Sequence, residues 1–287
     1  MQPLFFRTTF VSFNLSFYCL KQELVVNLPD VSNPLWFLII SFIVYAVVVG
    51  RYFLLSWLFY RVFHVWQWEK WKSKKINQRD YNPGQFRKEI IRSNMTAILF
   101  GISGAVLLLL WQKGYMKIYE DIHAYPIWWL PVSLIAALIL QEIYYYWLHR
   151  WMHIPSIFRV VHKWHHESHI ASPWTAFSFH PIEGLIQAIF LPLILLFLPM
   201  NLYVLIVMLT IMSVSSVINH LDIEIYPRWF ARNIFGKSVI GATHHALHHK
   251  QYKYNFGLYF TWLDRMFKTE SPVYDELIDE KTSTGLS

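Results

Sequence analysis

Three long apolar runs dominate the pattern of hydrophobic and polar positions along the chain. Residues 35–60 carry one charge, Arg51; residues 95–111 carry none; and residues 127–148 carry only Glu142. A transmembrane α-helix needs about 20 mostly apolar residues. The pattern therefore predicts three membrane-spanning helices, of which the second is short.

A fourth apolar stretch, residues 184–219, is interrupted by Pro192 and by the sequence Pro-Met-Asn at 199–201. This pattern predicts two helices of about 15–18 residues, joined by a tight turn, which either cross the bilayer or only dip into it. Residues 1–33 mix apolar patches with scattered charges and do not have the pattern of a cleaved signal peptide. We expect an N-terminal segment (1–33) outside the core, followed by one membrane-embedded unit (34–287).

The basic residues predict the orientation of this bundle. Residues 61–92 hold nine Lys or Arg against three Asp or Glu, whereas the 112–126 loop holds two of each kind. Cytoplasmic loops carry the excess of basic residues in membrane proteins. We expect residues 149–182 and 220–287 to lie in the cytoplasm with residues 61–94, forming a helical cap on an all-α integral membrane bundle.

Composition narrows the class of protein. The chain is 55% hydrophobic and 15% charged, whereas soluble domains carry about 25% charged residues. Its single cysteine, Cys19, excludes a disulfide scaffold and a cysteine-based zinc or iron–sulfur site. We attribute the net charge of +7 to topology and to attraction by lipid headgroups, and we expect no nucleic-acid binding.

Histidines gather in three short motifs. The first is H-x(3)-H at 149–153, and the motifs at 162–166 and 245–249 share the spacing H-x-x-H-H. Such spacings place the rings on one face of a helix. Imidazoles packed this densely repel one another when protonated, so a cation is expected to organise them. The candidate metal ligands are His149, His153, His162, His165, His166, His220, His245, His248 and His249, with His244 as a tenth.

Nine or ten nitrogen ligands suit two metal ions with four or five ligands each. Imidazole alone leaves iron, zinc, copper and nickel open. The zinc-protease motif H-E-x-x-H is absent, because His169 follows His166 one position too early. A soluble di-iron bundle needs two Glu-x-x-His segments, and the chain has one, at 120–123, on the predicted outer side.

Two further residues of the third apolar run are candidates for the site. Glu142 is ionisable inside a predicted span and lies on the same helical face as His149 and His153. We expect Glu142 to accept an N–H from a ligand histidine or a hydroxyl from a neighbouring tyrosine; the alternative is that it only reaches the membrane interface. Tyr145, one turn before His149, is the tyrosine to test.

The three histidine motifs, with the flanking segments W-T-A-F-S-F-H-P-I-E-G (174–184) and N-F-G-L-Y-F-T-W-L-D-R (255–265), resemble the fatty acid hydroxylase and sterol desaturase superfamily. The resemblance covers residues 95–270 and is nearest to the sterol C5-desaturase branch. It implies two iron ions held by the histidines named above, O₂ as co-substrate, and hydroxylation or desaturation of a sterol or fatty-acyl lipid. It also implies a location in the bacterial inner membrane or the endoplasmic reticulum.

The resemblance implies roles for two more residues. His180 matches a histidine of the family and is expected beside the metal ligands or facing the substrate; the alternative is a polar residue that opens the hairpin. Asp222, two residues after His220, is expected to orient that ligand. The sequence has no G-x-G-x-x-G pattern, no ferredoxin cysteine set and no cytochrome b5-like segment. Electrons are therefore expected from a separate donor: a cytochrome b5-like protein, a ferredoxin or a reductase.

Two rival functions use the same histidines. A zinc-dependent membrane hydrolase or isomerase would need the ligands but no reductant. A metal transporter or sensor would place its ligands near the middle of the bilayer, whereas these motifs lie beyond the predicted helix ends. Metal analysis separates the zinc-dependent hydrolase or isomerase from the oxidoreductase.

Overall fold

The computed structural model describes residues 28–283, in which nearly all regular structure is helical. In chain order the elements are α2 (Pro34–Tyr60), η1 (Arg61–Trp66), α3 (Trp68–Trp71), η2 (Lys72–Lys74), α4 (Gln85–Gln112), β1 (Ile118–Tyr119), α5 (Trp129–Met152), α6 (Pro155–Val161), α7 (Lys163–His166), η3 (Pro173–Phe177), α8 (Pro181–Leu195), β2 (Met200–Asn201), α9 (Leu202–Asn219), α10 (Arg228–Arg232), η4 (Gly236–Ser238), α11 (Ala242–Gln251), α12 (Trp262–Met266) and α13 (Tyr274–Ser283).

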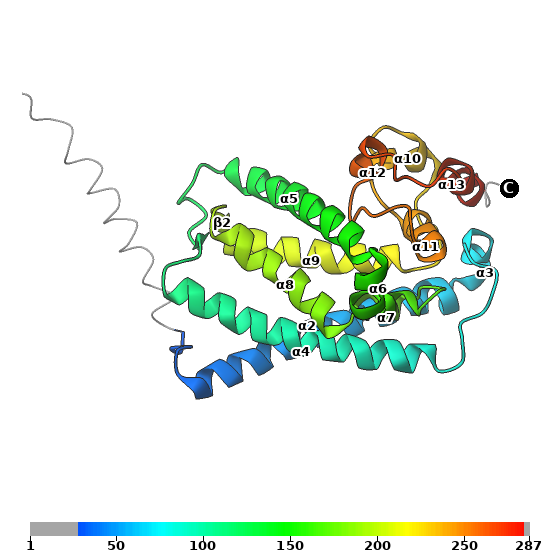
Figure 1. Cartoon of the computed structure of the whole chain (residues 1–287). Coiled ribbons are helices and arrows are strands. Elements are labelled where there is room, and N and C mark those ends of the chain that lie inside the picture. Colours follow the sequence, from blue (N-terminus) through cyan, green and yellow to red (C-terminus); the bar gives the residue numbers. More distant parts are fainter. Residues whose placement is uncertain (1–27, 284–287) are drawn as a thin grey trace, which may run out of the picture.

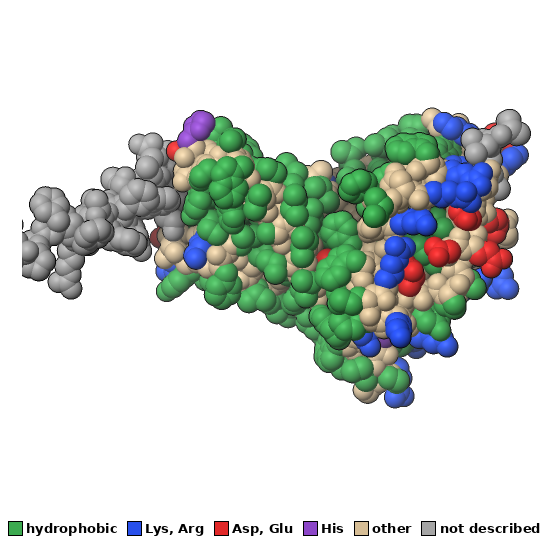
Figure 2. Space-filling view, turned by 90° about the horizontal axis from the view of Figure 1, so that it is seen from above, with side chains coloured by type: hydrophobic (Ala, Val, Ile, Leu, Met, Phe, Trp, Pro, Cys, Tyr) green, Lys and Arg blue, Asp and Glu red, His purple; other side chains and the backbone are tan. Residues whose placement is uncertain are grey.

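Four helices of the described chain are long and apolar enough to cross a membrane: Pro34–Trp66, α4, α5 and α9, with α8 as a shorter apolar helix. They expose large apolar side chains, such as Leu38 at 66% and Phe42 at 68%. Figure 2 shows this apolar surface over the bundle, with charged side chains gathered at the cap end. The prediction of an all-α, multi-pass membrane bundle with a histidine-rich helical cap is confirmed.

Helices α2 and α4 form the most extensive helix pair of the bundle. They approach closely at Gly101, where a Cβ atom would lie 2.6 Å from the carbonyl oxygen of Ser41. Small residues allow such close backbone approach between membrane helices. Helix α2 begins at Pro34, and the side chain of Asn33 accepts a hydrogen bond from the N–H of Leu35.

The apolar stretch 184–219 forms a hairpin of α8 and α9 that traverses the bundle. Pro192 lies inside α8, which continues to Leu195. At the turn, β2 pairs in parallel with β1 of the α4–α5 connection, and the Trp129 indole N–H donates to the Pro199 carbonyl, 2.9 Å away. The turn therefore lies at the end opposite the histidines (Figure 1). Helix α9 is long and apolar enough to cross a bilayer, whereas α8 is shorter, so whether the hairpin crosses or dips stays a prediction.

The other end of the bundle carries the cap. Helices α6, α7 and α11 lie against the ends of the long helices, and α10, α12 and α13 lie outside them (Figure 1). Of the predicted N-terminal segment, residues 1–27 lie outside the described part of the chain. Val31 is buried, and its backbone N–H donates to the Gln112 side chain. The division of the chain at residue 34 stays a prediction.

Candidate metal centre

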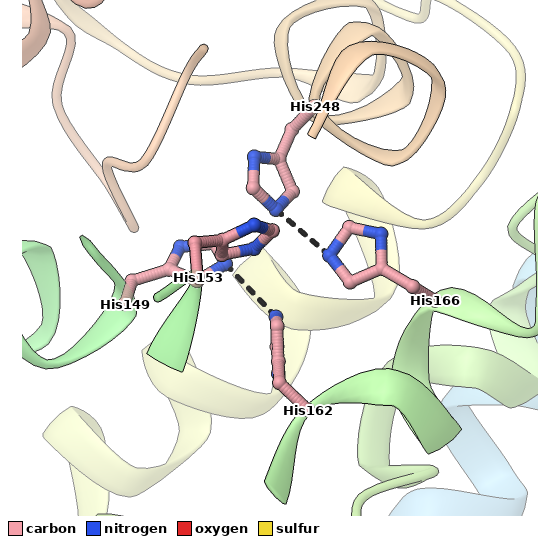
Figure 3. A group of neighbouring side chains, drawn as sticks. All are labelled: His149, His153, His162, His166 and His248. Atoms are coloured by element: carbon pink, nitrogen blue, oxygen red, sulfur yellow. Dashed lines mark hydrogen bonds between the residues drawn. The ribbon is translucent and has the colours of Figure 1, made fainter. Parts of the chain in front are cut away.

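Nine of the ten candidate histidines lie in two neighbouring groups at the cap end. In each group, the nitrogen atoms that face one another lie within 4.8 Å. The first group is His149, His153, His162, His166 and His248, and the second is His165, His220, His245 and His249. Figure 3 shows the first group converging on one point. The groups are adjacent, because the ring centres of His166 and His249 are 4.7 Å apart.

Local structure explains why residues so distant in sequence meet. The last turn of α5 presents His149 and His153 one turn apart, and Pro155 then starts the short α6 that leads to His162. Helix α9 ends at His220, which caps it and faces α7 and α11. Helix α11 is buried along most of its length, which lets three ligand candidates on it point inward.

Backbone carbonyls fix the protonation of the first group. His149 Nδ1 lies 2.9 Å from the Phe256 oxygen, and His248 Nδ1 lies 2.7 Å from the Tyr254 oxygen. A carbonyl accepts only, so each Nδ1 carries the proton and each Nε2 keeps its lone pair. His149 Nε2 lies 3.1 Å from His162 Nε2, and His162 Nδ1 faces a carboxylate, that of Glu183. Two lone pairs facing at this distance repel one another unless a cation lies between them.

The second group has the same arrangement. His220 Nδ1 lies 2.7 Å from the Ser216 oxygen, and His249 Nδ1 lies 3.1 Å from the Ser168 oxygen. Their Nε2 atoms lie 2.9 and 3.1 Å from Nε2 of His245. Metal-binding histidines typically donate their other N–H to a carbonyl or a carboxylate. Both groups therefore fit a metal ion by donor type and orientation, and metal binding itself stays a prediction.

Burial keeps these rings neutral. Desolvation lowers the pKa of His153 to about 2 and that of His220 to about 4, and it lowers the pKa of His165 and His248 well below the usual value. Neutral imidazole is the form that binds metal. The unliganded site is thus already in the protonation state that a metal requires.

Glu183 is a residue of the site that sequence reasoning missed. It is fully buried, and one carboxylate oxygen lies 2.9 Å from Nδ1 of His162. The same oxygen accepts from the Gln187 side chain at 3.1 Å. Such a carboxylate fixes the orientation and the tautomer of a ligand histidine. The available signal was its place directly before the apolar hairpin segment, three residues after His180.

Glu89 is the second missed residue. Its buried carboxylate accepts hydrogen bonds from the hydroxyls of Ser168, Ser172 and Thr175 at 2.6 to 2.8 Å. This ties the segment after α7 to α4, and the Ser168 carbonyl in that segment is the partner of His249. In the sequence, Glu89 is one of three acidic residues in a basic region, and no motif singles it out.

Glu142 is buried, but its partners differ from those expected. Its carboxylate accepts from the backbone N–H groups of Leu258, Tyr259 and Phe260 at 2.7 to 3.2 Å, and from no histidine or tyrosine side chain. Glu142 is fully buried, so it does not reach the membrane interface either. It holds the 256–260 loop, whose Phe256 carbonyl accepts a hydrogen bond from Nδ1–H of His149.

His180 and Asp222 also differ from expectation. His180 Nδ1 accepts a hydrogen bond from the Ile182 N–H at 3.3 Å and thereby caps α8. This is the alternative role, that of a polar residue that opens the hairpin. Asp222 accepts from the backbone and side chain of Asn77, at 3.1 and 2.6 Å, and not from His220. Asp222 therefore joins the α9 end to the α3–α4 connection.

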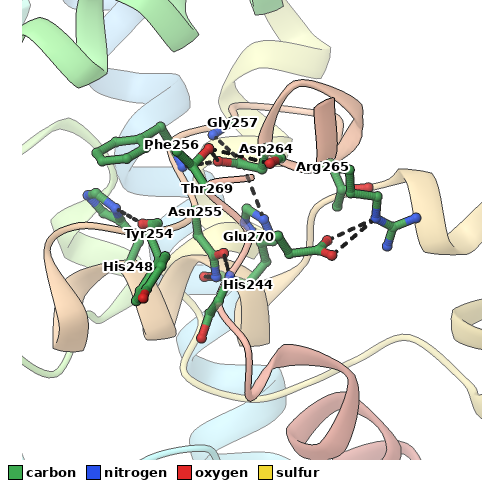
Figure 4. Close-up of polar contacts among 12 residues, drawn as sticks. His244, His248, Tyr254, Asn255, Phe256, Gly257, Asp264, Arg265, Thr269 and Glu270 are labelled. Carbon is green, nitrogen blue, oxygen red and sulfur yellow. Dashed lines mark hydrogen bonds and ion pairs between the residues drawn. The ribbon is translucent and has the colours of Figure 1, made fainter. Parts of the chain in front are cut away.

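His244 is the one candidate ligand outside both groups. Its Nε2 lies 3.5 Å from Asp264, and its ring packs edge-on against Tyr274. Asp264 also accepts from the N–H groups of Phe256 and Gly257, at 2.9 Å each (Figure 4). His244 thus faces the loop that supports the site and points away from the two groups.

A cavity of about 370 Å³ leads from the membrane-spanning helices to the second histidine group. Its walls are mostly apolar and come from α2, α4, α5, α8 and α9, and His220 and His245 lie on its wall. Tyr145 also lines it, with its ring centre 5.0 Å from that of His149. Val47 lines the cavity and is 61% exposed, so the cavity opens onto the apolar outer surface of the bundle.

Comparisons with known proteins identify relatives of this chain. The family model described as fatty acid hydroxylase matches residues 134–269. The chain is 30% identical over 224 residues to the Delta(7)-sterol 5(6)-desaturase erg3C of Aspergillus fumigatus, covering 69% of this chain and 67% of the relative. It is 29% identical over 198 residues to the Delta(7)-sterol 5(6)-desaturase ERG3B of Gibberella zeae, covering 67% and 60%.

A mammalian relative gives the same result. The chain is 31% identical over 188 residues to the lathosterol oxidase of Rattus norvegicus, covering 63% of this chain and 60% of the relative. The chain thus spans about 60 to 67% of the length of these relatives. No solved structure matches it. The chain belongs to the fatty acid hydroxylase and sterol desaturase superfamily, in its sterol desaturase-like branch.

Proposed function

We propose that the protein is a membrane-bound, di-iron, O₂-dependent oxidoreductase that hydroxylates or desaturates a C–H bond of a lipid of sterol or fatty-acyl type. The observation that carries this proposal is the contact between an apolar cavity, open to the lipid side, and two of the clustered histidines, His220 and His245. The sterol desaturases and lathosterol oxidases among its relatives support the same reaction class.

The donor set supports two metal ions. Five nitrogens are available in the first group and four in the second, and their lone pairs converge. When bound, two iron ions would supply the activation of O₂ and the removal of hydrogen from an unactivated C–H bond. The carbonyls of Phe256, Tyr254 and Ser216 hold the rings of three ligands in the tautomer that leaves Nε2 free.

The apolar residues that line the cavity bind the substrate, and aromatic rings packed on the histidines exclude water. Apolar side chains such as Leu191, Leu209 and Met212 line the cavity and leave the substrate few positions to hydrogen-bond. Phe179 packs on His165 and Phe256 on His149, with ring centres 5.2 and 5.6 Å apart, which screens the histidines from solvent. Tyr145 lies between the cavity and His149, where it contacts a bound lipid.

Orientation and electron supply complete the proposal. The basic residues before α4 favour a cytoplasmic location for the histidine end, in a bacterial inner membrane or the endoplasmic reticulum. Electrons are supplied by a separate donor: a cytochrome b5-like protein, a ferredoxin or a reductase. A cap at the membrane surface leaves the site within reach of such a partner.

The test is lipid mass spectrometry of a host with and without the chain. A lipid gaining 16 mass units identifies hydroxylation, and a lipid losing 2 identifies desaturation. The purified protein is expected to contain iron and to depend on O₂ and reductant. Activity with zinc alone and without reductant would overturn the proposal in favour of a hydrolase or isomerase.

A further inference from the structure

The cavity has one permanently charged side chain on its wall, and that charge is positive. Arg51 lines the cavity from α2, and no Asp, Glu or Lys lines it with Arg51. Residues 44, 47, 48 and 51 form one face of α2, so three valines lead along the wall to the guanidinium. A charge in such an apolar site is expected to have an anionic or hydrogen-bonding partner.

That partner is not found within the described chain. Among residues 28–283, no hydrogen bond or ion pair of Arg51 is formed, and its buried Nε atom has no acceptor. By contrast, Arg92 at the histidine end pairs with Glu167 and with the Trp164 carbonyl. Arg61 and Arg228 also have a buried Nε atom without an acceptor, but of these three arginines only Arg51 lines the cavity. Its unsatisfied donor therefore points to a ligand in the cavity.

Helix η3 fixes where this charge lies. The Tyr52 hydroxyl, beside Arg51, donates to the Trp174 carbonyl at 2.8 Å, and the Ser216 hydroxyl donates to the Ala176 carbonyl at 2.9 Å. Arg51 is thus held level with Ser216, one turn before His220. The head of a lipid bound to Arg51 lies at the histidine end, and its tail runs past the valines toward Leu107 and Leu205.

We propose that this cavity selects lipids with an anionic head, a carboxylate or a phosphate, which Arg51 binds by charge-assisted hydrogen bonds. The inference rests on the proposed function only in taking the cavity as the substrate site. It names an acidic lipid, and not a neutral sterol, as the preferred substrate class. Arg51 lies outside the part of the chain that matches the family model, so this preference is a property of the N-terminal helix.

Binding is measured without turnover, on the metal-free full chain in nanodiscs of phosphatidylcholine. The probes are deuterated octadecanoic acid, octadecyl phosphate and methyl octadecanoate, and their occupancy is read by native mass spectrometry. Wild type is expected to bind an acidic probe roughly ten-fold or more tightly than the ester. The acid and the phosphate together show which anionic head is preferred.

Three variants test the assignment to Arg51. Arg51→Gln is expected to lose the preference for acidic probes while it keeps ester binding, which also shows that it is folded. Arg51→Lys should retain part of the preference. Arg61→Gln, in η1 directly after α2 and off the cavity wall, should bind as wild type does. Equal affinity of wild type for acid and ester, or equal loss of both probes in Arg51→Gln, would overturn the proposal. Because no metal is present, a failed oxidoreductase assay does not affect this result.

Discussion

The Nδ1 atom of His162 and a carboxylate oxygen of Glu183 lie 2.9 Å apart, and both side chains are fully buried. The imidazole N–H that points at Glu183 leaves Nε2 to face His149. Replacing Glu183 by Gln removes the negative charge that raises the basicity of this ring. We expect metal affinity to fall about 10- to 100-fold, because carboxylates that support ligands have effects of this size.

Metal titration of the purified Glu183→Gln protein measures this effect. The exposed Glu276→Gln on α13 is the matched control and should bind metal as wild type does. Wild-type metal affinity in Glu183→Gln would show that the contact with His162 does not support a metal ligand.

His244 and His248 both lie on α11 but point in different directions, and this difference gives the second prediction. His248 belongs to the first group, whereas His244 contacts Asp264 and Tyr274. His248→Ala is expected to lose metal and all turnover. His244→Ala is expected to keep two metals per chain but to lower the free energy of unfolding by roughly 1–3 kcal/mol, because Asp264 loses a buried partner.

Elemental analysis and thermal unfolding separate the two variants. Loss of a metal ion in His244→Ala, with no change in unfolding temperature, would place His244 among the ligands. Full metal content and full activity in His248→Ala would remove His248 from them.

Much of this arrangement could be predicted from the sequence. The apolar runs predicted the long helices, because the length and composition needed to cross a bilayer are local properties. The repeated H-x-x-H-H spacing predicted the clustered histidines, but not that each of these motifs is divided between the two groups. The partners of Glu142 could not be predicted, because they are backbone N–H groups more than 110 residues away, at 258–260. Backbone groups leave no trace in a side-chain pattern.

Tertiary contacts that the sequence pattern does not contain explain the positions of Asp222 and Glu183. Asp222 lies two residues from His220 but follows the end of α9 with a φ of 58°, and it faces Asn77. Proximity in sequence did not place it beside the ligand, because the chain turns there. Glu183 supports His162 across 21 positions, and only tertiary packing of α8 against the cap brings them together.

Acidification gives the third prediction. Burial lowers the pKa of nine candidate ligands outside the membrane spans: His153, His162, His165, His166, His220, His244, His245, His248 and His249. Below about pH 6.5 the unfolded chain takes up protons at these positions, whereas folded His220 stays neutral until about pH 4. The metal-free protein is therefore expected to lose stability as the pH falls through this window.

Buried carboxyl groups act in the opposite direction. Burial raises the pKa of Asp222 to about 7 and that of Asp264 to about 6, and it also raises the pKa of Glu224 and Glu270, so the folded state keeps their protons where the unfolded state loses them. These groups favour the folded state on acidification, but they are fewer than the histidines. Unfolding temperatures measured between pH 7.5 and pH 5 should fall with pH, and bound metal should reduce that dependence. A temperature that is constant or rises toward pH 5 would contradict the neutral, buried state of the histidines.

The last prediction concerns which end of the bundle faces the cytoplasm. Tyr115, in the α4–α5 connection, and Lys253, after α11, are exposed at opposite ends of the molecule. Cys19 is the single native cysteine, so a Cys19→Ser background allows one new thiol at a time. In bacterial spheroplasts, a membrane-impermeant maleimide is expected to label Tyr115→Cys at once and Lys253→Cys only after the membrane is opened. The physical reason is the excess of Lys and Arg in residues 61–92, which resists transfer across the membrane during insertion. Immediate labelling of Lys253→Cys, with Tyr115→Cys protected, would place the histidines on the outer face, away from cytoplasmic electron donors.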